Sequence, residues 1–463
     1  MNKAFLKKFF AAFLAVLMTL ASAVRYGGIV LKSKFNGSDY SVTRIDLSVK
    51  PEGLAEKFDY LYDLTTLDNS LDYAAHPDSV LLKNGNILTM YPAGHGKGAV
   101  LNKISTDGGI SWSDSLQNTP KSWETSRETP TVYRLEFTGG KADKLIMISA
   151  NPKWGTEPTT GGFNCSISTD EGKNWSEFEL LYDKNSDGGV IPIVAMSSLT
   201  RLKENGKFVD KWMGLFHDAD FYNYKTILTF DEDGKMHWSK PEKYFGAYRD
   251  IEKRTNMCEV EVIRSDGGKG DELCLITRSN TKKENSLLSF SSDEGKTWSK
   301  PVYAPAALNG ERHKADYTPD GRLFITFRSI ERGKKAAANA PIENRNGWMS
   351  EGWVAWVGTY EDLKNQTEGQ YRIKLAHTYL KLQSNKDYAA NADTGYCGNV
   401  VLSDGTIVTT SYGCFDNTDF LKNLDFRTSI ASKRINLSDI DELAAWLETR
   451  PKTEETTKSV FGC

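Results

Sequence analysis

The sequence predicts an all-β chain folded as a β-propeller of four-stranded antiparallel blades, with a short C-terminal helix. The first of two repeats behind this prediction has the pattern S-x-D-x-G-x-x-W. It occurs at Ser105–Trp112, Ser168–Trp175 and Ser291–Trp298, and Thr229–Trp238 is a looser copy with two extra residues. The pattern is typical of a β-hairpin tip, because Asp accepts hydrogen bonds from its own turn and Gly permits positive φ. Recurring copies indicate a repeat architecture.

The second repeat is a strand, a tight turn and another strand, out of phase with the first. Its turns include Asn84-Gly85, Asp320-Gly321 and Asp404-Gly405, which are strong hairpin signals between β-rich runs. With three related segments, the repeat predicts six innermost strands that start near residues 76, 127, 190, 256, 311 and 394. This spacing fits six blades with variable loops.

The two ends of the propeller region give further expectations. Strands between Tyr26 and Leu47 are expected either to close the ring or to build a seventh blade. Residues Leu437–Arg450 are predicted to form a surface helix, with Ser438 as its N-cap.

The N-terminus has the layout of a secretory signal peptide. A basic start is followed by an apolar stretch, Phe9–Leu20, and by Ala21-Ser22-Ala23. We therefore expect a signal peptide over residues 1–23, cleavage after Ala23, and one propeller domain over residues 24–463, secreted or periplasmic and free of the membrane. An uncleaved anchor is the alternative. The chain has no basic block, which argues against a nucleic-acid partner.

Cysteine and metal-ligand spacings give weaker signals. Cys258 and Cys274 flank one turn, and Cys397 and Cys414 flank another, so each pair is either a cross-hairpin disulfide or two small buried side chains. No CxxC or HExxH spacing occurs, so neither a metal nor another cofactor is predicted. The run His217–Asp220 could line the pocket or bind a cation, although a solvated loop is the simpler interpretation.

A propeller places its ligand on one face, around the central channel, where each innermost strand begins and each second strand ends. We expect ionisable side chains from these positions to converge, which indicates a functional site. The starts of the innermost strands contribute His76, Asp78, Arg127, Glu128, Glu259, Glu261, Arg312, His313 and Tyr396, and the ends of the second strands contribute His95, Arg278 and Arg328.

The first repeat resembles the Asp boxes of the sialidase superfamily. By that resemblance, Tyr396 is the nucleophile that Glu259 activates, Arg278 is the second of three carboxylate-binding arginines, and Arg312 or Arg328 is the third. The first blade departs from the family. His76-Pro77 stands where sialidases have Arg-Ile-Pro, and the loop that carries their acid/base Asp carries His95 in this chain.

The two histidines favour proton transfer near neutral pH. The site is similar to that of propeller lyases that cleave L-rhamnose-α-1,4-D-glucuronate by β-elimination. On that resemblance, His76 or His95 is the base, the other or Tyr396 is the acid, and Arg127 and Arg278 hold the uronate. The expected partner is a glycan with a carboxylate-bearing sugar at its non-reducing end.

Two alternatives remain open. One is a sialidase-like hydrolase of sialic acid or another 2-keto-3-deoxy sugar, with Asp78 or His95 as acid/base. The other is a glycan-binding propeller without catalysis. In each case Arg312, Arg328, Asp78 and His313 are expected to contact the glycan.

Overall fold

The computed structural model describes residues 29–35, 38–71, 73–95, 98–113, 115–153, 159–194, 196–281, 284–329, 352–378, 393–415 and 428–450. The predicted signal peptide lies outside these ranges. Among the described residues, no helix has the length and apolar character needed to cross a bilayer.

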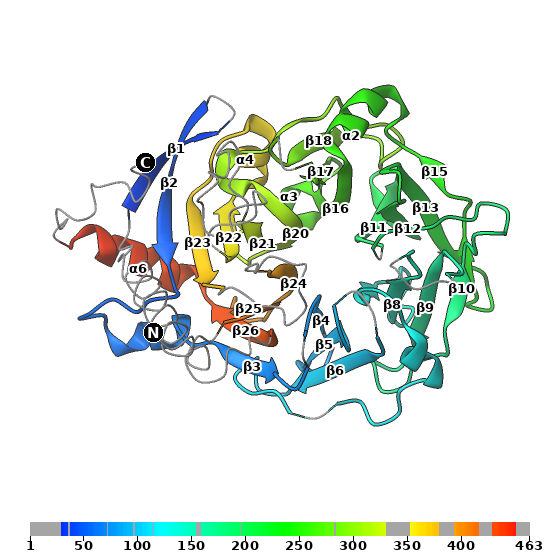
Figure 1. The fold of residues 1–463 in the computed structure, drawn as a ribbon, viewed down its shortest axis with the longest axis horizontal. Coiled ribbons are helices and arrows are strands. Elements are labelled where there is room, and N and C mark those ends of the chain that lie inside the picture. The colour runs from blue at the N-terminus through cyan, green and yellow to red at the C-terminus, as the bar shows by residue number, and fades with distance from the viewer. Residues whose placement is uncertain are drawn as a thin grey trace, which may run out of the picture.

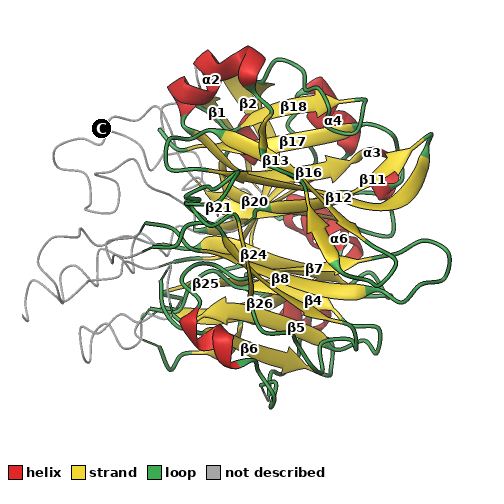
Figure 2. Ribbon diagram, turned by 90° about the vertical axis from the view of Figure 1, so that its right-hand side faces the viewer, coloured by secondary structure: helices red, strands yellow, loops and turns green. Residues whose placement is uncertain are grey.

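Six sheets stand around a central axis as the blades of a propeller (Figure 1), and their strands run between the two faces of the ring (Figure 2). The predicted six-bladed fold is therefore confirmed.

Each blade begins with its innermost strand and adds strands outward. Blade 1 holds β4 (Asp78–Leu81), β5 (Ile87–Pro92) and β6 (Val100–Ser105); blade 2 holds β7 (Thr131–Leu135), β8 (Lys144–Ala150), β9 (Phe163–Ser168) and β10 (Glu179–Leu181); blade 3 holds β11 (Ser198–Glu204), β12 (Lys207–His217), β13 (Asn223–Phe230), β14 (Met236–Trp238) and β15 (Glu242–Lys243). Blade 4 holds β16 (Met257–Arg264), β17 (Leu273–Ser279), β18 (Leu287–Ser291) and β19 (Val302–Tyr303); blade 5 holds β20 (Gly310–Tyr317), β21 (Leu323–Ser329), β22 (Trp353–Gly358) and β23 (Tyr371–Ala376); blade 6 holds β24 (Gly395–Val401), β25 (Ile407–Gly413), β26 (Ser429–Ile435) and β3 (Thr65–Asp68).

Short helices lie at the ends and edges of the blades. Within the described ranges the α-helices are α2 (Arg249–Thr255), α3 (Ser265–Gly268), α4 (Tyr360–Asn365) and α6 (Leu437–Glu448), and the 3₁₀ helices are η1 (Glu56–Leu61), η2 (Lys121–Thr125), η3 (Gly246–Tyr248) and η4 (Ala306–Leu308). Helix α6 matches the predicted C-terminal helix. Its cap is Asn436, whose Oδ1 accepts from the backbone N–H of Ser438 at 3.0 Å, so the prediction of Ser438 as N-cap is wrong.

The N-terminal strands do not have the predicted role. Strands β1 (Ile29–Phe35) and β2 (Ser38–Asp46) form a hairpin, and β2 pairs in parallel with β23 at the outer edge of blade 5. They neither close the ring nor build a seventh blade. The ring is closed instead by β3, which comes before blade 1 in sequence but pairs with β26 as the outermost strand of blade 6.

The closure brings the innermost strands of blades 6 and 1 together at Gly398. A Cβ atom on Gly398 would lie 2.5 Å from the backbone N of Ser79, closer than real Cβ contacts. The Ser79 hydroxyl lies 2.9 Å from the Thr410 hydroxyl of blade 6 and 2.8 Å from the Thr89 hydroxyl of blade 1. The absence of a side chain at Gly398 therefore allows the two blades to pack backbone against backbone.

The Asp boxes form the predicted hairpin tips. In the third box, Asp293 accepts from the N–H of Thr297 at 2.9 Å, the Ser291 hydroxyl accepts from the N–H of Gly295 at 2.9 Å, and Gly295 has φ +73°. Trp298 at the end of the box is 7% exposed and packs in the core between blades 3 and 4. Each box thus satisfies its own turn and anchors a blade to its neighbour.

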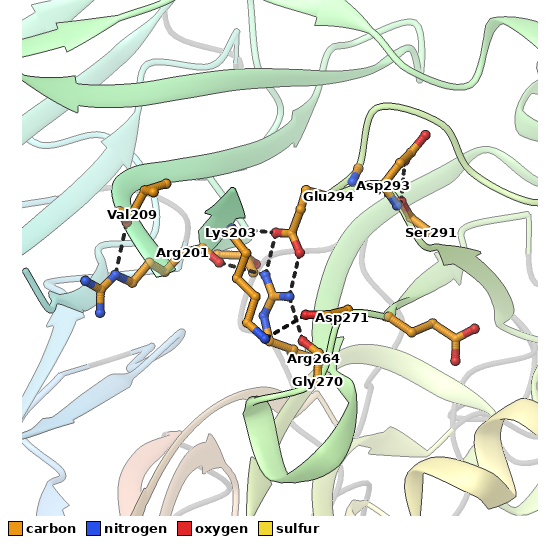
Figure 3. A network of polar contacts seen from close by, with 12 residues as sticks. Arg201, Lys203, Val209, Arg264, Gly270, Asp271, Ser291, Asp293 and Glu294 are labelled. Atoms are coloured by element: carbon orange, nitrogen blue, oxygen red, sulfur yellow. Dashed lines mark hydrogen bonds and ion pairs between the residues drawn. The ribbon is translucent and has the colours of Figure 1, made fainter. Parts of the chain in front are cut away.

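The Glu that follows Asp in two boxes forms a clamp between blades (Figure 3). Glu294 accepts two hydrogen bonds of 2.7 Å from the Arg264 guanidinium and one of 2.9 Å from the N–H of Lys203 in blade 3. The same guanidinium donates to the carbonyl of Arg201, also in blade 3, at 2.9 Å. Glu171 and Arg134 repeat this arrangement against the end of β4 in blade 1.

The cysteines are buried side chains within the blades. All five cysteines in the described part of the chain are buried, and Cys274 and Cys397 are free thiols. Each predicted disulfide needs one of these two, so both disulfide predictions are wrong. The small-hydrophobe alternative agrees with the structure, since burial raises the pKa of the Cys397 thiol to about 11 and keeps it protonated.

Candidate active site

Four residues with left-handed backbone mark where innermost strands begin on one face of the ring. His76, Glu259, Arg312 and Tyr396 have φ between +47° and +57°. In β16, β20 and β24 these residues sit in bulges, where the register shifts between Cys258 and Glu261, Glu311 and Lys314, and Gly395 and Gly398. A left-handed φ costs a non-glycine residue about 1–2 kcal/mol. The bulges re-aim Glu259, Arg312 and Tyr396 toward one another, whereas His76 lies just before β4, whose register has no bulge.

Tyr396 and Glu259 form the central pair. The Tyr396 hydroxyl donates a short hydrogen bond to Glu259 Oε1, and Arg278 Nη1 donates to Glu259 Oε2 at 2.8 Å. Burial alone would raise the pKa of Glu259, but Arg278 and the two hydrogen bonds lower it to about 2. Burial and the neighbouring Glu259 raise the pKa of Tyr396 well above its usual range. At neutral pH a protonated phenol therefore faces an ionised carboxylate.

Two arginines are held by two further carboxylates. Arg278 and Arg328 contact the same oxygen of Glu311, at 3.1 Å and 2.8 Å. Arg328 also pairs with Asp393, whose second oxygen accepts from the Tyr73 hydroxyl at 2.5 Å. Burial would raise the pKa of Asp393, but Arg328, together with His95 and the Tyr73 hydroxyl, lowers it to about 2.

The ring of His76 makes tilted contacts with the rings of Tyr396 and His95. The ring of His76 lies 4.1 Å from the ring of Tyr396 and 4.8 Å from that of His95, between centroids. His76 Nδ1 lies 3.1 Å from the Thr129 hydroxyl, and burial lowers the pKa of His76 well below its usual range, so the ring is neutral. The His95 side chain is 45% exposed, with Nδ1 3.7 Å from Asp393. Of the two histidines, His95 is therefore the one that solvent reaches.

Arg312 differs from the other two arginines. It is 8% exposed, lies 5.4 Å above the Tyr396 ring and donates to the backbone carbonyl of Ser197 at 3.2 Å. No carboxylate within the described ranges forms an ion pair with it, although nearby acidic groups help to hold its pKa above the usual value. Its guanidinium therefore has donors left for an anionic group.

Of the remaining predicted residues, Glu128 lies beside the cluster, with Oε1 3.6 Å from His76 Nδ1, whereas Asp78, His313 and Arg127 lie outside it. Asp78 accepts from the N–H groups of Ser79 and Val132 at 3.0 Å each and pairs with Lys314 at 3.3 Å, so its carboxylate joins blades. His313 Nε2 lies 3.0 Å from the Leu308 carbonyl, and burial lowers the pKa of His313 to about 4. Arg127 is half-buried between η2 and β7, with no ion pair or hydrogen bond to the cluster among the described contacts.

The cluster also contains three residues that the sequence did not single out: Glu311, Asp393 and Tyr73. Glu311 lies directly before Arg312, at the predicted start of an innermost strand. This position alone could have identified Glu311 as a candidate site residue. Asp393 and Tyr73 precede the first strands of blades 6 and 1 and carry no local pattern. Nothing in the described part of the chain groups three His, Cys, Asp or Glu side chains in a way that could hold a metal ion.

Comparison with known proteins gives matches of two kinds. A family model described as a BNR repeat-like domain matches residues 130–336, and one described as a BNR/Asp-box repeat matches residues 103–114. None of the curated proteins compared with the sequence matches it.

Solved structures share the fold. A protein of unknown function from Dyadobacter fermentans has 16% identity and a TM-score of 0.52, over 80% of this chain and 96% of its own. NanB sialidase from Streptococcus pneumoniae (K499G mutant) has 11% identity and a TM-score of 0.51, over 81% and 71%. The GH93 α-L-arabinofuranosidase of Fusarium graminearum has 12% identity and a TM-score of 0.50, over 81% and 97%. At these identities the likeness is one of fold. With its Asp boxes, its six blades and the repeat-model matches, the chain is a six-bladed β-propeller that carries BNR/Asp-box repeats.

Proposed function

We propose that this chain is an exported enzyme that hydrolyses a terminal sugar of a glycan, with Tyr396 as nucleophile. The observation that carries the proposal is the hydrogen bond from the Tyr396 hydroxyl to Glu259, which joins blades 6 and 4 across 137 residues of sequence. A phenol is a weak nucleophile until a base takes its proton, and a buried carboxylate with a pKa of about 2 is ionised and placed to do so.

The reaction would proceed in two balanced steps. The Tyr396 oxygen attacks the anomeric carbon while its proton passes to Glu259, and His95 gives a proton to the departing glycosidic oxygen. Water then attacks the same carbon, with His95 as base, and Tyr396 leaves and recovers its proton from Glu259. His95 suits the acid/base role because it is the half-exposed member of the cluster and Asp393 lies 3.7 Å from its ring.

The substrate class follows from Arg312. A buried guanidinium without a carboxylate partner is costly, and a carboxylate on the substrate would both offset that cost and orient the sugar over Tyr396. We therefore propose a terminal sugar that carries a carboxylate, such as sialic acid or another 2-keto-3-deoxy sugar. The signal-peptide pattern of residues 1–23 supports export, and the proposed chemistry needs no cofactor.

A lyase is the second candidate, and the ring contacts of His76 with His95 and Tyr396 favour it. In this alternative His76 or His95 removes the C5 proton of a uronate, and Tyr396 or the other histidine gives a proton to the 4-linked oxygen. The bond between that oxygen and C4 breaks, and a C4–C5 double bond forms. Rhamnose-capped glucuronate is the corresponding substrate.

One experiment separates the two chemistries. Sialyl-lactose and a rhamnose-capped glucuronate glycan are digested side by side, with ultraviolet absorbance and free sugar measured together. Hydrolysis releases sialic acid without new absorbance, and elimination releases rhamnose with the absorbance of an unsaturated uronate. Under the hydrolase, Tyr396→Phe lowers kcat by about 10³-fold, whereas His76→Ala, which keeps Tyr396 and Glu259, loses less. Turnover of neither substrate by the intact chain would contradict both candidates.

A further inference from the structure

Blade 3 contributes a buried histidine to the same ring of positions that holds two of the arginines. His217 is the last residue of β12, and Arg278 and Arg328 lie near the ends of β17 and β21. Each of these three strands is the second strand of its blade. Glu259, Arg278 and Arg312 are near enough to influence the pKa of His217, although burial dominates and lowers it to about 4. His217 is 2% exposed, and its Nδ1 makes no hydrogen bond within the part of the chain that the structure describes.

The turn that follows His217 places an aromatic ring against it. The Phe221 ring lies 5.8 Å from the His217 ring at an interplanar angle of 12°, so the two are stacked. Phe221 is half-buried and has a left-handed backbone, with φ +55°. A phenylalanine in this conformation is strained and gains no side-chain hydrogen bond in return.

The turn itself is rigid. Asp218 Oδ1 accepts from the N–H groups of Asp220 at 3.0 Å and Tyr222 at 2.9 Å, and the Arg249 guanidinium donates to the Phe221 carbonyl at 2.8 Å. Arg249 also lies over the Tyr222 ring, 3.5 Å from its centroid. These contacts fix the left-handed residue, but none of them needs a phenyl ring. Asn or Gly would satisfy the backbone at lower cost, so the ring is kept for another reason.

We infer that Phe221 and His217 form a binding subsite for the neutral sugar that adjoins the bond to be cleaved. Phe221 offers its apolar face to the C–H face of a pyranose, and the buried ring of His217 supports the Phe221 ring from behind. The ionised groups gather around Tyr396 on blades 4 to 6, whereas this aromatic pair on blade 3 has no charge at neutral pH. It therefore fits the leaving-group sugar rather than the acidic one. The inference rests on the proposed function, since it assigns the site two sugar positions.

The deciding variant is Phe221→Asn, which removes the ring and relieves the strained backbone. Gln366→Asn is the matched control, because Gln366 caps α4 with φ +55° far from the site. Protein with isotope-labelled histidine is titrated with lactose, and the His217 ring signals are followed by NMR. We expect saturable shifts in the wild type and in Gln366→Asn, and affinity weaker by about tenfold in Phe221→Asn, with thermal stability unchanged or raised.

The outcome does not depend on turnover. If lactose fails to shift the His217 signals, or if Phe221→Asn binds it as the wild type does, the subsite is refuted even in an active hydrolase. If lactose binds as expected but sialyl-lactose is not cleaved, the proposed function fails and the subsite stands. A loss of stability in Phe221→Asn would also count against it, since the ring would then be structural.

Discussion

Glu259 takes part in the proposed chemistry and also contributes to the stability of the fold. Its carboxylate accepts from both Tyr396 and Arg278, and its pKa in the folded protein, about 2, lies below the ordinary glutamate value. Folding therefore favours the ionised form. The resulting stabilisation is complete above about pH 4.5 and is lost as the pH falls toward 2.

The pH dependence of Glu259→Gln tests this link. At neutral pH the variant should be less stable than the wild type by about 3 kcal/mol, because Arg278 loses its ionised partner. The difference should shrink as the pH falls from 4.5 to 2, since the wild type then loses the same stabilisation. Urea denaturation at a series of pH values measures it. If the free energies of unfolding of the wild type and the variant differed by the same amount down to pH 2, Glu259 would not be held ionised by the fold.

Arg312 gives a second prediction about a single residue. Arg312→Gln keeps a donor for the Ser197 carbonyl but removes the charge above Tyr396. If this charge binds a substrate carboxylate in both ground and transition states, KM for sialyl-lactose should rise by about 10–100-fold with little change in kcat. Arg254→Gln at an exposed helix end serves as control. An unchanged KM in Arg312→Gln would exclude Arg312 from substrate recognition.

Two clamps built from Asp-box glutamates join strands of neighbouring blades. Arg264 and Glu294 have side chains only 5% and 15% exposed, whereas Arg134 and Glu171 are 18% and 27% exposed. Arg134 donates two hydrogen bonds of 2.8 Å to Glu171, and they hold the pKa of Glu171 at about 2. Removing one partner of a buried pair leaves the other charge without compensation. The more buried clamp should therefore lose more stability when one of its partners is removed.

We therefore expect Glu294→Gln to lower the free energy of unfolding by about 3–5 kcal/mol and Glu171→Gln by less. Lys211→Gln breaks an exposed ion pair with Glu204 and should change stability little. Chemical denaturation of the three variants measures the ranking. Equal losses in Glu294→Gln and Lys211→Gln would show that the clamp adds nothing beyond an ordinary surface pair.

The same elements show what a sequence can and cannot foretell. The Asp-box tips were predictable because their hydrogen bonds run between residues two to four apart, as from Thr297 to Asp293. The place of the hairpin β1–β2 was not predictable, because its partner β23 lies far away in the sequence and edge pairing leaves no local pattern. Asp393 escapes prediction for a similar reason, since its partners Arg328 and Tyr73 meet it only in the closed ring.

At the scale of the molecule, closing the ring and assembling the site are one event. His76 lies three residues before Ser79 on blade 1, and Tyr396 lies two residues before Gly398 on blade 6. The contact between Ser79 and Gly398 that seals the ring therefore also sets the 4.1 Å separation of the His76 and Tyr396 rings. Any change that parts blades 1 and 6 should disturb the site before it unfolds blades 2 to 5, whose core clusters lie away from this seam.

Gly398→Ala tests this coupling. The added Cβ would meet the Ser79 backbone at 2.5 Å, which neither strand can avoid without moving, and overpacking of this kind costs about 1–3 kcal/mol. Gly246→Ala is the control, because a Cβ there meets nothing within 4 Å. We expect Gly398→Ala to lower both the melting temperature and kcat, with the loss of activity already complete at temperatures where the variant is still folded. If activity instead falls only as the protein melts, the seam between blades 1 and 6 holds the ring together without setting the geometry of the site.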